Sequence, residues 1–541
     1  MRIGLDFDNT IADYDRAFSD VARSIGIKTE ASSKKALKTE LLSLRDGEST
    51  WQKIQGLTYG PHISRATLFS GVAEFIYRAR LLGHDLFIVS HKTEFGHFDE
   101  SRTPLRLAAQ TWLVDNGIVG TGSHQIDRER VFFGGTRDQK VAHIRALDLD
   151  VFVDDLAEVL ADEAFPLTTR RVLFGASEQD VKRDLDAAIF ASLLWDQIAI
   201  ELLGDFDAES IATLAQAIWP TLKIDDAEFI YGRGNSRILK LNSVTGPMAL
   251  KIYPNLTHDS RPRRVTEWSA SEFLAGQGFP VPSRRATSLA LNWSAFDWVS
   301  GASPNAGETN ALIAARDFVK RLKMASNSAI DVGDFSNAVE ACLNPTDLQN
   351  QIAARQSRLL EVGNADLRSF LERVVSPSID TAVSKARNQL SNHFAIGLDR
   401  KLQILSPSDF GLHNCINETG GGFKFIDFEY FGWDDPVKLV LDFCLHPGVE
   451  LSISNQKWWL TEMKLVFSSD DYFDQRLRAL FPLYVIRWAQ IILNEFLIEK
   501  VVNRQHARGR YSYDVPAVQA EQLLKAKTMM SQIERRSEFW N

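Results

Sequence analysis

Five short apolar runs along the first 175 residues constrain the fold of this chain more than any other feature. They are RIGLDFD, HDLFIVS, RVFFG, DVFVDD and RRVLF, which begin at residues 2, 84, 130, 150 and 170. Helix-like stretches separate the runs, and each run is apolar along both of its faces. Strands that are buried on both faces and joined through helices are typical of βαβ units. The sequence therefore predicts an α/β domain built on a parallel sheet.

Polar side chains stand at the carboxyl ends of these runs, where ligands bind in parallel sheets. The first run ends in Asp6 and Asp8, which point to the same side because side chains alternate along a strand. The second run ends in Ser90, and the fourth ends in Asp154 and Asp155. We therefore expect a carboxylate-rich site at this edge of the sheet.

This series resembles the haloacid-dehalogenase-like phosphatases over residues 1–180. The resemblance rests on the D-x-D-x-T motif that ends in Thr10, a serine after a strand, the lysine Lys140 on a later helix, and a strand that ends in two aspartates. It implies that Asp6 is the nucleophile and forms an aspartyl-phosphate, while Asp8 protonates the leaving oxygen and then activates water. It also implies three side chains that hold phosphoryl oxygens: Thr10, Ser90 and Lys140.

Mg²⁺ is the cofactor that the resemblance implies, because it favours hard oxygen ligands beside a phosphate. Its candidate ligands are four carboxylates: Asp6, Asp8, Asp154 and Asp155. The residues alone leave open which of Asp154 and Asp155 touches the metal directly. A degenerate scaffold without activity is the alternative, but several motifs in order, each at the end of its own element, favour an active site.

Much of the segment between Thr10 and Ser90 has helical character and resembles a helical cap inserted after the first strand, over about residues 14–72. Such a cap closes over the substrate and excludes water, so a small phosphorylated metabolite is the expected substrate. We predict the phosphatase domain over residues 1–185. A helical connector without strands is predicted over residues 186–225.

The pattern changes in the second half of the chain. The segment AEFIYGRGNSRILKLNS indicates two strands joined by a turn that carries Gly232 and Gly234. The next strand carries Lys251, and the helix after it contains Glu267 and Glu272. A glycine hairpin lets backbone N–H groups approach nucleotide phosphates, and a strand lysine can pair with those phosphates and with a helix glutamate.

The segment LSPSDFGLHNCI, residues 405–416, contains the letters DFG of the metal-binding triplet of protein kinases. Kinase-like enzymes need a catalytic aspartate, a metal-binding asparagine five residues later and a further metal-binding aspartate after a strand. Asp409 and Asn414 have the first spacing, and Asp427 follows an apolar strand 18 residues after Asp409. The letters DFG are therefore a coincidence. We predict Asp409 as the catalytic aspartate, and Asn414 and Asp427 as Mg²⁺ ligands.

The order of these parts resembles the aminoglycoside phosphotransferase and choline kinase-like enzymes over about residues 205–541. The resemblance includes LAGQGFPVP after the helix, which makes Glu267 the partner of Lys251, and it includes IDFEYFGWDDP followed by LDF. It implies ATP as cosubstrate, with the adenine received at a hinge by Trp298 and Val299. Gly232 and Gly234 would then lie beside the nucleotide phosphates.

The residues before the catalytic aspartate depart from the family's pattern. The family usually has His-Gly there, whereas this chain has Pro407 and Ser408, which puts the supporting contacts of the loop in doubt. The resemblance implies a bilobal α+β kinase-like domain over residues 226–541, with a smaller lobe at 226–301 and a helical larger lobe at 302–541.

Composition narrows the classes of function. A chain of 541 residues predicts two to four domains. A net charge of −9 argues against broad nucleic-acid binding, and the chain lacks the G-x-x-x-x-G-K-[ST] motif of P-loop kinases. Charged and polar residues interrupt the longest apolar stretches, so no membrane span is expected. Three scattered cysteines fit a reducing cytoplasm.

The leading hypothesis is a bifunctional enzyme, a phosphomonoester hydrolase joined to a phosphotransferase with an alcohol acceptor. A Mg²⁺-dependent phosphatase would act on a small metabolite, and an ATP-dependent kinase would act on the same or a related molecule. The resemblance favours sugar or polyol phosphates of surface-polysaccharide assembly. One alternative keeps the phosphatase and makes the second half a non-catalytic nucleotide-binding module. Another is a nucleic-acid end-processing enzyme, which the acidic charge and the missing P-loop disfavour. The oligomeric state stays open.

Overall fold

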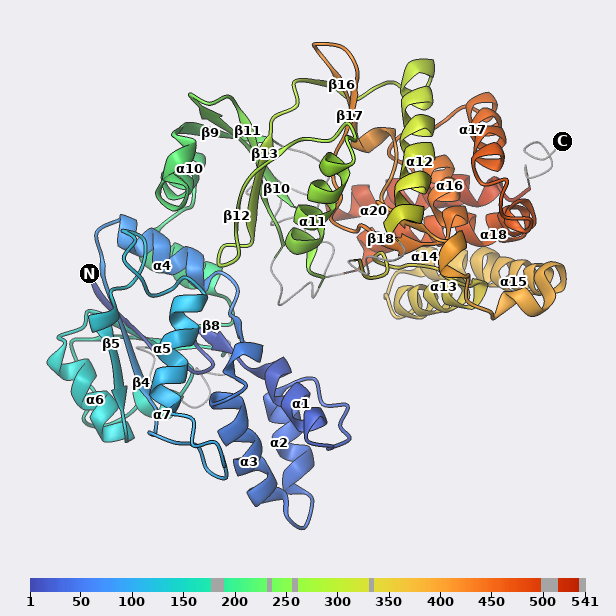
Figure 1. The fold of residues 1–541 in the computed structure, drawn as a ribbon. Helices are drawn as coiled ribbons and strands as arrows, with labels where there is room; N and C mark the ends of the chain where they lie inside the picture. Colours follow the sequence, from blue (N-terminus) through green and yellow to red (C-terminus); the bar gives the residue numbers. More distant parts are fainter. Residues whose placement is uncertain (177–188, 231–235, 255–260, 330–334, 498–513, 535–541) are drawn as a thin grey trace.

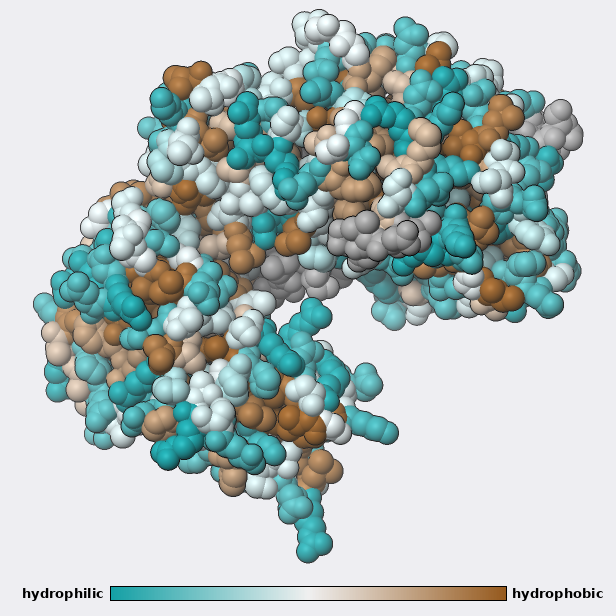
Figure 2. Space-filling view, viewed as in Figure 1, coloured by the Kyte–Doolittle hydropathy of each residue, from teal (hydrophilic) through white to brown (hydrophobic). Residues whose placement is uncertain are grey.

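The computed structural model of the chain describes residues 1–176, 189–230, 236–254, 261–329, 335–497 and 514–534. Figure 1 shows two parts that follow one another along the chain, an α/β part in blue and cyan and an α+β part from green to red. Among the described residues, no helix has the length and apolarity needed to cross a bilayer. On the face shown in Figure 2, hydrophobic residues form separate patches between hydrophilic ones.

A six-stranded parallel sheet forms the centre of the first part, with the strand order β5-β4-β1-β6-β7-β8. Its strands are β1 (Arg2–Leu5), β4 (Asp85–His91), β5 (Val131–Gly134), β6 (Val151–Asp154), β7 (Arg170–Phe174) and β8 (Ile189–Ser192). Alternate residues of β4 and β6 enter two different hydrophobic clusters, so the sheet is buried on both faces. The parallel sheet predicted from the five apolar runs is confirmed.

Helices lie on both faces of this sheet (Figure 1). They are α4 (Val72–Leu81), α5 (Leu105–Asp115), α6 (Arg137–Ala146) and α7 (Ala157–Leu160). These helices cover the faces of the sheet and not the ends of its strands. Polar side chains can therefore meet at the carboxyl ends of β1 and β6, where ligands bind in sheets of this topology.

Strand β8 corrects the prediction of a purely helical connector over residues 186–225. Residues 189–192 pair in parallel with β7 and form the edge of the first sheet. No glycine or proline separates this strand, IFAS, from the apolar helix that follows it, so the sequence does not mark the strand's end. The helical part of the connector consists of α9 (Trp195–Leu203) and α10 (Ala208–Ile218).

Three helices project from the first sheet where the sequence predicts a cap: α1 (Asp15–Ser24), α2 (Lys34–Leu42) and α3 (Gly47–Tyr59) (Figure 1). The short strands β2 (Ala12–Asp13) and β3 (Thr67–Leu68) pair antiparallel at the base of this insertion. The chain therefore leaves and re-enters the sheet domain at one place, directly after β1. Aromatic rings from Tyr14, Phe18, Trp51 and Tyr59 pack together inside the insertion.

A five-stranded antiparallel sheet begins the second part, with the order β12-β13-β11-β10-β9. Its strands are β9 (Ile224–Ile230), β10 (Arg237–Ser243), β11 (Met248–Ile252), β12 (Arg284–Ser288) and β13 (Trp293–Asp297), and α11 (Arg263–Gly276) packs against β12 and β13. The predicted glycine turn, with Gly232 and Gly234, lies outside the described residues.

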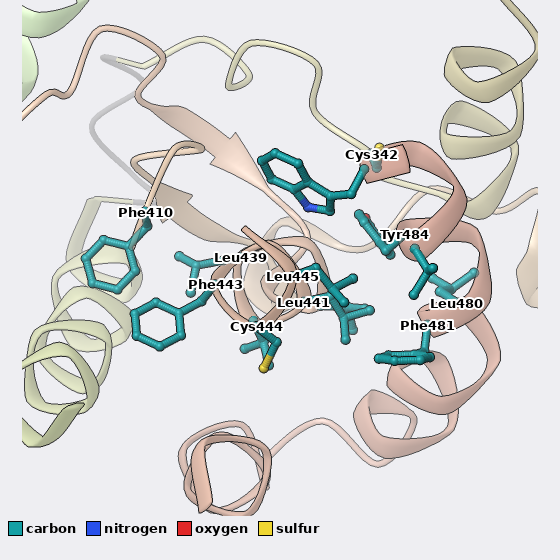
Figure 3. Packing of buried hydrophobic residues seen from close by; sticks show 14 of the residues in the cluster. Cys342, Phe410, Leu439, Leu441, Phe443, Cys444, Leu445, Leu480, Phe481 and Tyr484 are labelled. Carbon is teal, nitrogen blue, oxygen red and sulfur yellow. The ribbon is translucent and has the colours of Figure 1, made fainter. Parts of the chain in front are cut away.

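The rest of the chain is mainly helical, as predicted. Its helices are α12 (Thr309–Ala329), α13 (Pro345–Leu360), α14 (Ala365–Phe370), α15 (Ser376–Leu390), α16 (Pro436–Leu445), α17 (Ile453–Val466), α18 (Phe473–Ile492) and α20 (Val515–Ser531). Every residue of α16 is buried. Figure 3 shows α16 end-on, with Phe410 and Phe443 on one side and Tyr484 of α18 on the other.

Short strands between these helices carry the predicted catalytic segment. They are β15 (Ile404–Ser406), β16 (Cys415–Glu418), β17 (Phe423–Phe425) and β18 (Gly432–Asp434). Phe410, the middle letter of the DFG sequence, is buried and packs against Phe425 and Phe443 with ring centroids 5.2 and 5.7 Å apart. The loop between β15 and β16 is thus anchored on the core through Phe410.

The two parts share a hydrophobic core. One cluster of buried residues runs from Ile3 on β1 through α4, α9 and α10 to Leu239 on β10 and Trp293 on β13. Arg78 of α4 also donates hydrogen bonds to two carbonyl oxygens at the end of α9 and just beyond it, at 2.8 and 3.1 Å. The helices of the connector are therefore packed between the two sheets.

Candidate active sites

The first site lies at the carboxyl ends of β1 and β6. Asp6 follows β1, Asp154 ends β6, and Lys140 of α6 lies between them. The Lys140 Nζ atom is 2.6 Å from Asp6 Oδ1 and 2.6 Å from Asp154 Oδ2, and all three side chains are buried. Burial acts to lower the pKa of Lys140, but the two carboxylates outweigh it and raise that pKa, so the lysine stays charged.

Three carboxylates converge at this edge. One oxygen each of Asp6, Asp154 and Asp155 lies within 4.8 Å of the others. Burial, together with repulsion from Asp6, raises the pKa of Asp154 to about 7 and that of Asp155 to about 8. An oxygen-only set with this mutual repulsion fits a hard divalent cation such as Mg²⁺. Both Asp154 and Asp155 contribute an oxygen to the set.

Asp8 is not one of these three converging carboxylates and has other contacts. Its Oδ1 atom accepts hydrogen bonds from the Tyr14 hydroxyl at 2.7 Å and from Lys92 Nζ at 3.0 Å. Its Oδ2 atom lies 2.9 Å from the same Lys92 Nζ. One ammonium group therefore contacts both oxygens of Asp8. A carboxylate held in this way beside Asp6 suits proton transfer.

The two predicted hydroxyl ligands of phosphate are placed differently. Ser90 lies on β4, two residues beyond the last pair of the ladder with β1, which joins Leu5 and Ile88. Thr10 is fully buried, and its hydroxyl has no hydrogen-bond partner within the described part of the chain. Its carbonyl accepts a hydrogen bond from the Trp195 indole at 3.0 Å. Ser90 therefore lies at the site's edge of the sheet, and Thr10 lies buried in the turn after β1.

Sequence reasoning missed two lysines at this site. Lys92 follows Ser90 by two positions, so strand alternation could have placed both side chains on one face. Lys34 comes from α2 in the inserted cap, and its Nζ donates to Asn9 Oδ1 at 3.3 Å and to the Tyr59 hydroxyl at 2.9 Å. Nothing in the local sequence marks Lys34, because the fold of the cap brings it to the turn after β1.

The second site is formed around Lys251 on β11. The Lys251 Nζ atom lies 2.7 Å from Glu267 Oε2 on α11, 2.6 Å from Asp427 Oδ1 and 2.9 Å from Glu429 Oε2. Glu272 pairs with a different cation, an arginine on β12. Of the two glutamates on α11, Glu267 is therefore the partner of Lys251.

Three carboxylates converge at this site, as they do at the first site. One oxygen each of Glu267, Asp427 and Glu429 lies within 4.8 Å of the others. Burial raises the pKa of Asp427 to about 7 even though Lys251 opposes the rise, and the neighbouring carboxylates add to it. Asp427 also has a φ of 69°, a left-handed conformation that costs a residue with a Cβ roughly 1–2 kcal/mol. The donor set again fits Mg²⁺, with Glu429 as a carboxylate absent from the predicted ligands.

The predicted catalytic loop lies against this cluster. The Asn414 side-chain amide donates to the Asp409 carbonyl at 2.9 Å, and the Asn414 carbonyl accepts from the Ile426 N–H at 2.9 Å. Asp409 contributes to the raised pKa of Asp427, so the two carboxylates lie within electrostatic range. The structure thus brings Asp409, Asn414 and Asp427 together on the side of Lys251.

Two stacked histidines flank Asp409. The Nε2 atoms of His413 and His446 lie 3.0 and 3.5 Å from Asp409 Oδ1, and the ring centroids are 3.6 Å apart. His446 Nδ1 accepts the Gly448 N–H at 3.0 Å, so neutral His446 has its proton on Nε2, facing Asp409. Burial, with the charge of His413, lowers the pKa of His446 to about 4. Burial acts to raise the pKa of Asp409, but the hydrogen bond from His413 and the charges of His413, His446 and Lys438 together outweigh it and lower that pKa.

The loop before Asp409, the predicted catalytic aspartate, has supporting contacts of its own through Ser408. Ser408 has a φ of 65°, and its hydroxyl donates to the Val339 carbonyl at 3.1 Å and accepts from Lys438 Nζ at 2.9 Å. Lys438 is buried on α16 and also lies 3.3 Å from Asp434 and 3.1 Å from Asp442. A buried lysine with two carboxylate partners thus supports this loop.

The predicted hinge lies between the second sheet and the helical part. Trp298 is half-buried and Val299 is buried, and the Trp298 N–H donates to the Pro247 carbonyl at 3.1 Å. Strand β14 (Gly301–Ala302) follows and pairs antiparallel with β16. A hollow of about 540 Å³ opens beside it, lined mainly by residues 301–305 and 417–419. Its volume is in the range of small-molecule sites.

No protein-family model and no curated protein matches this sequence. Solved structures that match include choline kinase LicA from Streptococcus pneumoniae, at 14% identity and a TM-score of 0.39, over 59% of this chain and 98% of that one. They also include a spectinomycin phosphotransferase in complex with ADP and spectinomycin, at 12% identity and a TM-score of 0.41, over 59% and 99% of the two chains. An ethanolamine kinase from Plasmodium vivax matches at 12% identity and a TM-score of 0.39, over 61% and 93%. At these sequence identities and TM-scores, the function of the chain has to be argued from its two sites.

Proposed function

We propose that this chain is a bifunctional enzyme, with a Mg²⁺-dependent phosphatase in its first part and an ATP-dependent small-molecule kinase in its second part. One observation carries the proposal: the chain contains two separate carboxylate clusters, each built around its own buried lysine. The first consists of Asp6, Asp154 and Asp155 with Lys140, and the second of Glu267, Asp427 and Glu429 with Lys251. Both combinations suit phosphoryl groups, whose oxygens need cationic partners.

In the proposed phosphatase, the Asp6 carboxylate attacks phosphorus, the ester P–O bond breaks, and the leaving oxygen takes a proton from the Asp8 carboxyl. Asp8 then accepts a proton from the water that attacks the aspartyl-phosphate. The bond between Asp6 and phosphorus breaks, and inorganic phosphate leaves. Tyr14 and Lys92 hold Asp8 in place for both proton transfers. Lys140 and Ser90 bind phosphoryl oxygens.

In the proposed kinase, the Asp409 carboxylate orients the acceptor hydroxyl and takes its proton. The hydroxyl oxygen attacks the γ-phosphorus of ATP, the bond from this phosphorus to the bridging oxygen breaks, and ADP leaves. Lys251, held by Glu267, binds nucleotide phosphates. His413 and His446 hold Asp409 Oδ1, which leaves Oδ2 for the acceptor.

Mg²⁺ would be held by the three aspartates of the first cluster, and by Asn414, Asp427 and Glu429 in the second site. When bound, it neutralises charge on the phosphoryl oxygens. The fit rests on the oxygen-only donor sets and on the raised pKa values of Asp154, Asp155 and Asp427, which result from burial together with repulsion from neighbouring carboxylates.

The substrate class that we infer is sugar or polyol phosphates, such as those used in surface-polysaccharide assembly. The inserted cap supports a small substrate, because it stands directly beside the phosphatase site. Two opposite activities at one position would only consume ATP. The two sites should therefore act at different positions of one molecule or on different molecules.

A metabolite screen tests the proposal. The purified chain is incubated with a panel of phosphorylated sugars and polyols, and phosphate release is measured. It is also incubated with ATP and the unphosphorylated panel, and ADP is measured. We expect both activities, their loss with EDTA and their return with Mg²⁺. Absence of phosphate release and of acceptor-dependent ADP formation across the panel would contradict the proposal.

A further inference from the structure

The cap brings a lysine next to the reacting groups of the first site. Lys34 is the first residue of α2, and its Nζ donates to Asn9 Oδ1 and to the Tyr59 hydroxyl, at 3.3 and 2.9 Å. Its backbone N–H donates to Asp15 Oδ1 on α1 at 2.9 Å, which ties the start of α2 to α1. Asn9 directly follows Asp8 in the chain, so the Lys34 ammonium lies beside the turn that presents the acid–base group.

Lys34 differs in charge balance from the other two lysines of the site. Lys140 is paired with two carboxylates, and Lys92 is paired with both oxygens of Asp8. Lys34 forms no ion pair within the described residues, and its two bonded partners are neutral. The charges of Asp8, Asp155, Asp15 and Asp6 act on Lys34 from a distance, and none of these carboxylates forms an ion pair with it among the described residues. The half-buried Lys34 ammonium group can therefore form a direct ion pair with an anionic group of a ligand.

The groups around Lys34 offer further hydrogen-bond donors. The Tyr59 hydroxyl accepts from Lys34, so its own proton is available to another acceptor. Burial raises the pKa of Tyr59 well above its usual value, which keeps that proton in place. Asn9 accepts from Lys34 through Oδ1 and has its NH₂ group left to donate. One cation and two neutral donors therefore stand together.

Aromatic rings limit the size of this subsite. The Lys34 Nζ atom lies 5.4 Å from the Phe18 ring centroid and 5.6 Å from that of Tyr59. The Tyr59 ring in turn packs edge-on against Tyr14, whose hydroxyl bonds to Asp8. Apolar walls lower the local dielectric constant and strengthen the attraction between the ammonium group and an anion.

We propose that Lys34, Tyr59 and Asn9 form a subsite for a second oxyanion of the phosphatase substrate, separate from the phosphoryl group that reacts at Asp6. The inference rests on the proposed phosphatase and narrows its substrate class. The substrate is a sugar or polyol phosphate that has a further acidic group, either a carboxylate or a second phosphate.

Calorimetry on the full chain with the Asp6→Asn substitution and Mg²⁺ tests the subsite without consuming the ligand. Three probes are compared: glycerol 3-phosphate, 3-phosphoglycerate, in which a carboxylate replaces the terminal alcohol, and 1,3-propanediol bisphosphate. We expect at least one of the two probes that have a second acidic group to bind at least tenfold tighter than glycerol 3-phosphate. The tighter of the two identifies which acidic group the subsite binds. Adding Lys34→Met should reduce this preference to less than threefold. Adding Lys35→Met, which removes an exposed lysine of the same helix, should leave the preference unchanged.

Equal affinity for all three probes, or no binding of any, would overturn the subsite. So would a Lys34→Met variant that weakens all three probes equally, because Lys34 would then contact the shared phosphoryl group. Hydrolysis by the chain with Asp6 intact is measured separately. If it hydrolyses no phosphate ester, the proposed phosphatase is wrong, while the binding preference still decides whether the anion subsite exists.

Discussion

Ser408 is the residue on which the catalytic loop of the proposed kinase depends most directly. Replacing it with alanine removes the hydrogen bonds to the Val339 carbonyl and from Lys438 and leaves both groups buried with one partner fewer. We expect Ser408→Ala to lower the kinase kcat about tenfold, or roughly 1.4 kcal/mol, without changing phosphatase activity. ADP formation at saturating ATP measures this. Ser378→Ala, at a half-buried serine on α15 whose hydroxyl donates to the Val374 carbonyl, is the control. An unchanged kcat in Ser408→Ala would contradict the role of the loop.

His446 acts on Asp409 through a single nitrogen. Phenylalanine at this position keeps a flat ring against His413 but removes the Nε2–H that faces Asp409 Oδ1. We predict that His446→Phe lowers the kinase kcat about threefold to tenfold and leaves the KM for ATP unchanged. His393→Phe, at a surface histidine that packs on a tyrosine ring, should have no effect. A rise in the KM for ATP with constant kcat would show that His446 does not position Asp409.

The sequence predicted those site residues whose position follows from the end of a strand. Asp6 and Asp154 are such residues, because an apolar run ending in aspartate fixes both the strand and the edge at which the carboxylate emerges. Lys34 could not be predicted, since only the fold of the cap brings it to Asn9. The contacts of Ser408 depend on a lysine 30 residues later in the chain, on the far side of β18. Long-range contacts of this kind have no local signature.

Helix α4 contains a carboxyl group whose ionisation is coupled to helix packing. Glu74 lies 3.5 Å from Arg78 and faces Asp196 on α9 and Arg237 on β10. Burial, with the charge of Asp196, raises the pKa of Glu74 to about 7, from 4.5. The folded chain therefore binds this proton more tightly than the unfolded chain, and the contribution of Glu74 to stability falls as the pH rises from 4.5 to 7.

We predict that Glu74→Gln removes the loss of folding stability that accompanies the rise in pH, which amounts to at most about 3 kcal/mol. Urea unfolding at pH 5 and at pH 7.5, followed by circular dichroism, measures it. The parent chain should lose more stability between the two values than the variant does. The control is Glu209→Gln, at an exposed position on α10. Parallel pH profiles for Glu74→Gln and the parent chain would show that Glu74 is not held in this environment.

The apolar runs predicted five strands of the first sheet, three of which have only four residues. The sixth strand, β8, also has four residues, but no glycine or proline separates it from α9. The sequence therefore does not mark the end of β8, and the prediction of a helical segment there is wrong. Strand β12, which pairs with β13, has the polar sequence RRATS. Pairing of a polar strand is decided by its neighbours, which the local sequence does not show.

The chain as a whole depends on the connector, because α10 covers one face of the second sheet. Phe206, Ile211 and Leu214 share a core with Leu239 and Trp293 of that sheet. We predict that a fragment of residues 205–541 stays soluble and keeps kinase activity. A fragment of residues 224–541 should aggregate or unfold at a temperature at least about 10 °C lower, because without α10 a core face of the second sheet is exposed to water. Thermal unfolding and sedimentation of the two fragments measure this. Equal stability of both would mean that α10 contributes little to the second part.

Two distinct phosphoryl-transfer sites in one chain are the central claim, and a pair of matched substitutions tests it most directly. Asp6→Asn and Asp409→Asn are assayed side by side for phosphate release from a phosphate ester and for ADP formation with an acceptor. We predict that Asp6→Asn loses at least about 1,000-fold of the first activity and keeps the second, and that Asp409→Asn shows the reverse. Retention of both activities in either variant, or loss of both activities in each, would contradict the claim.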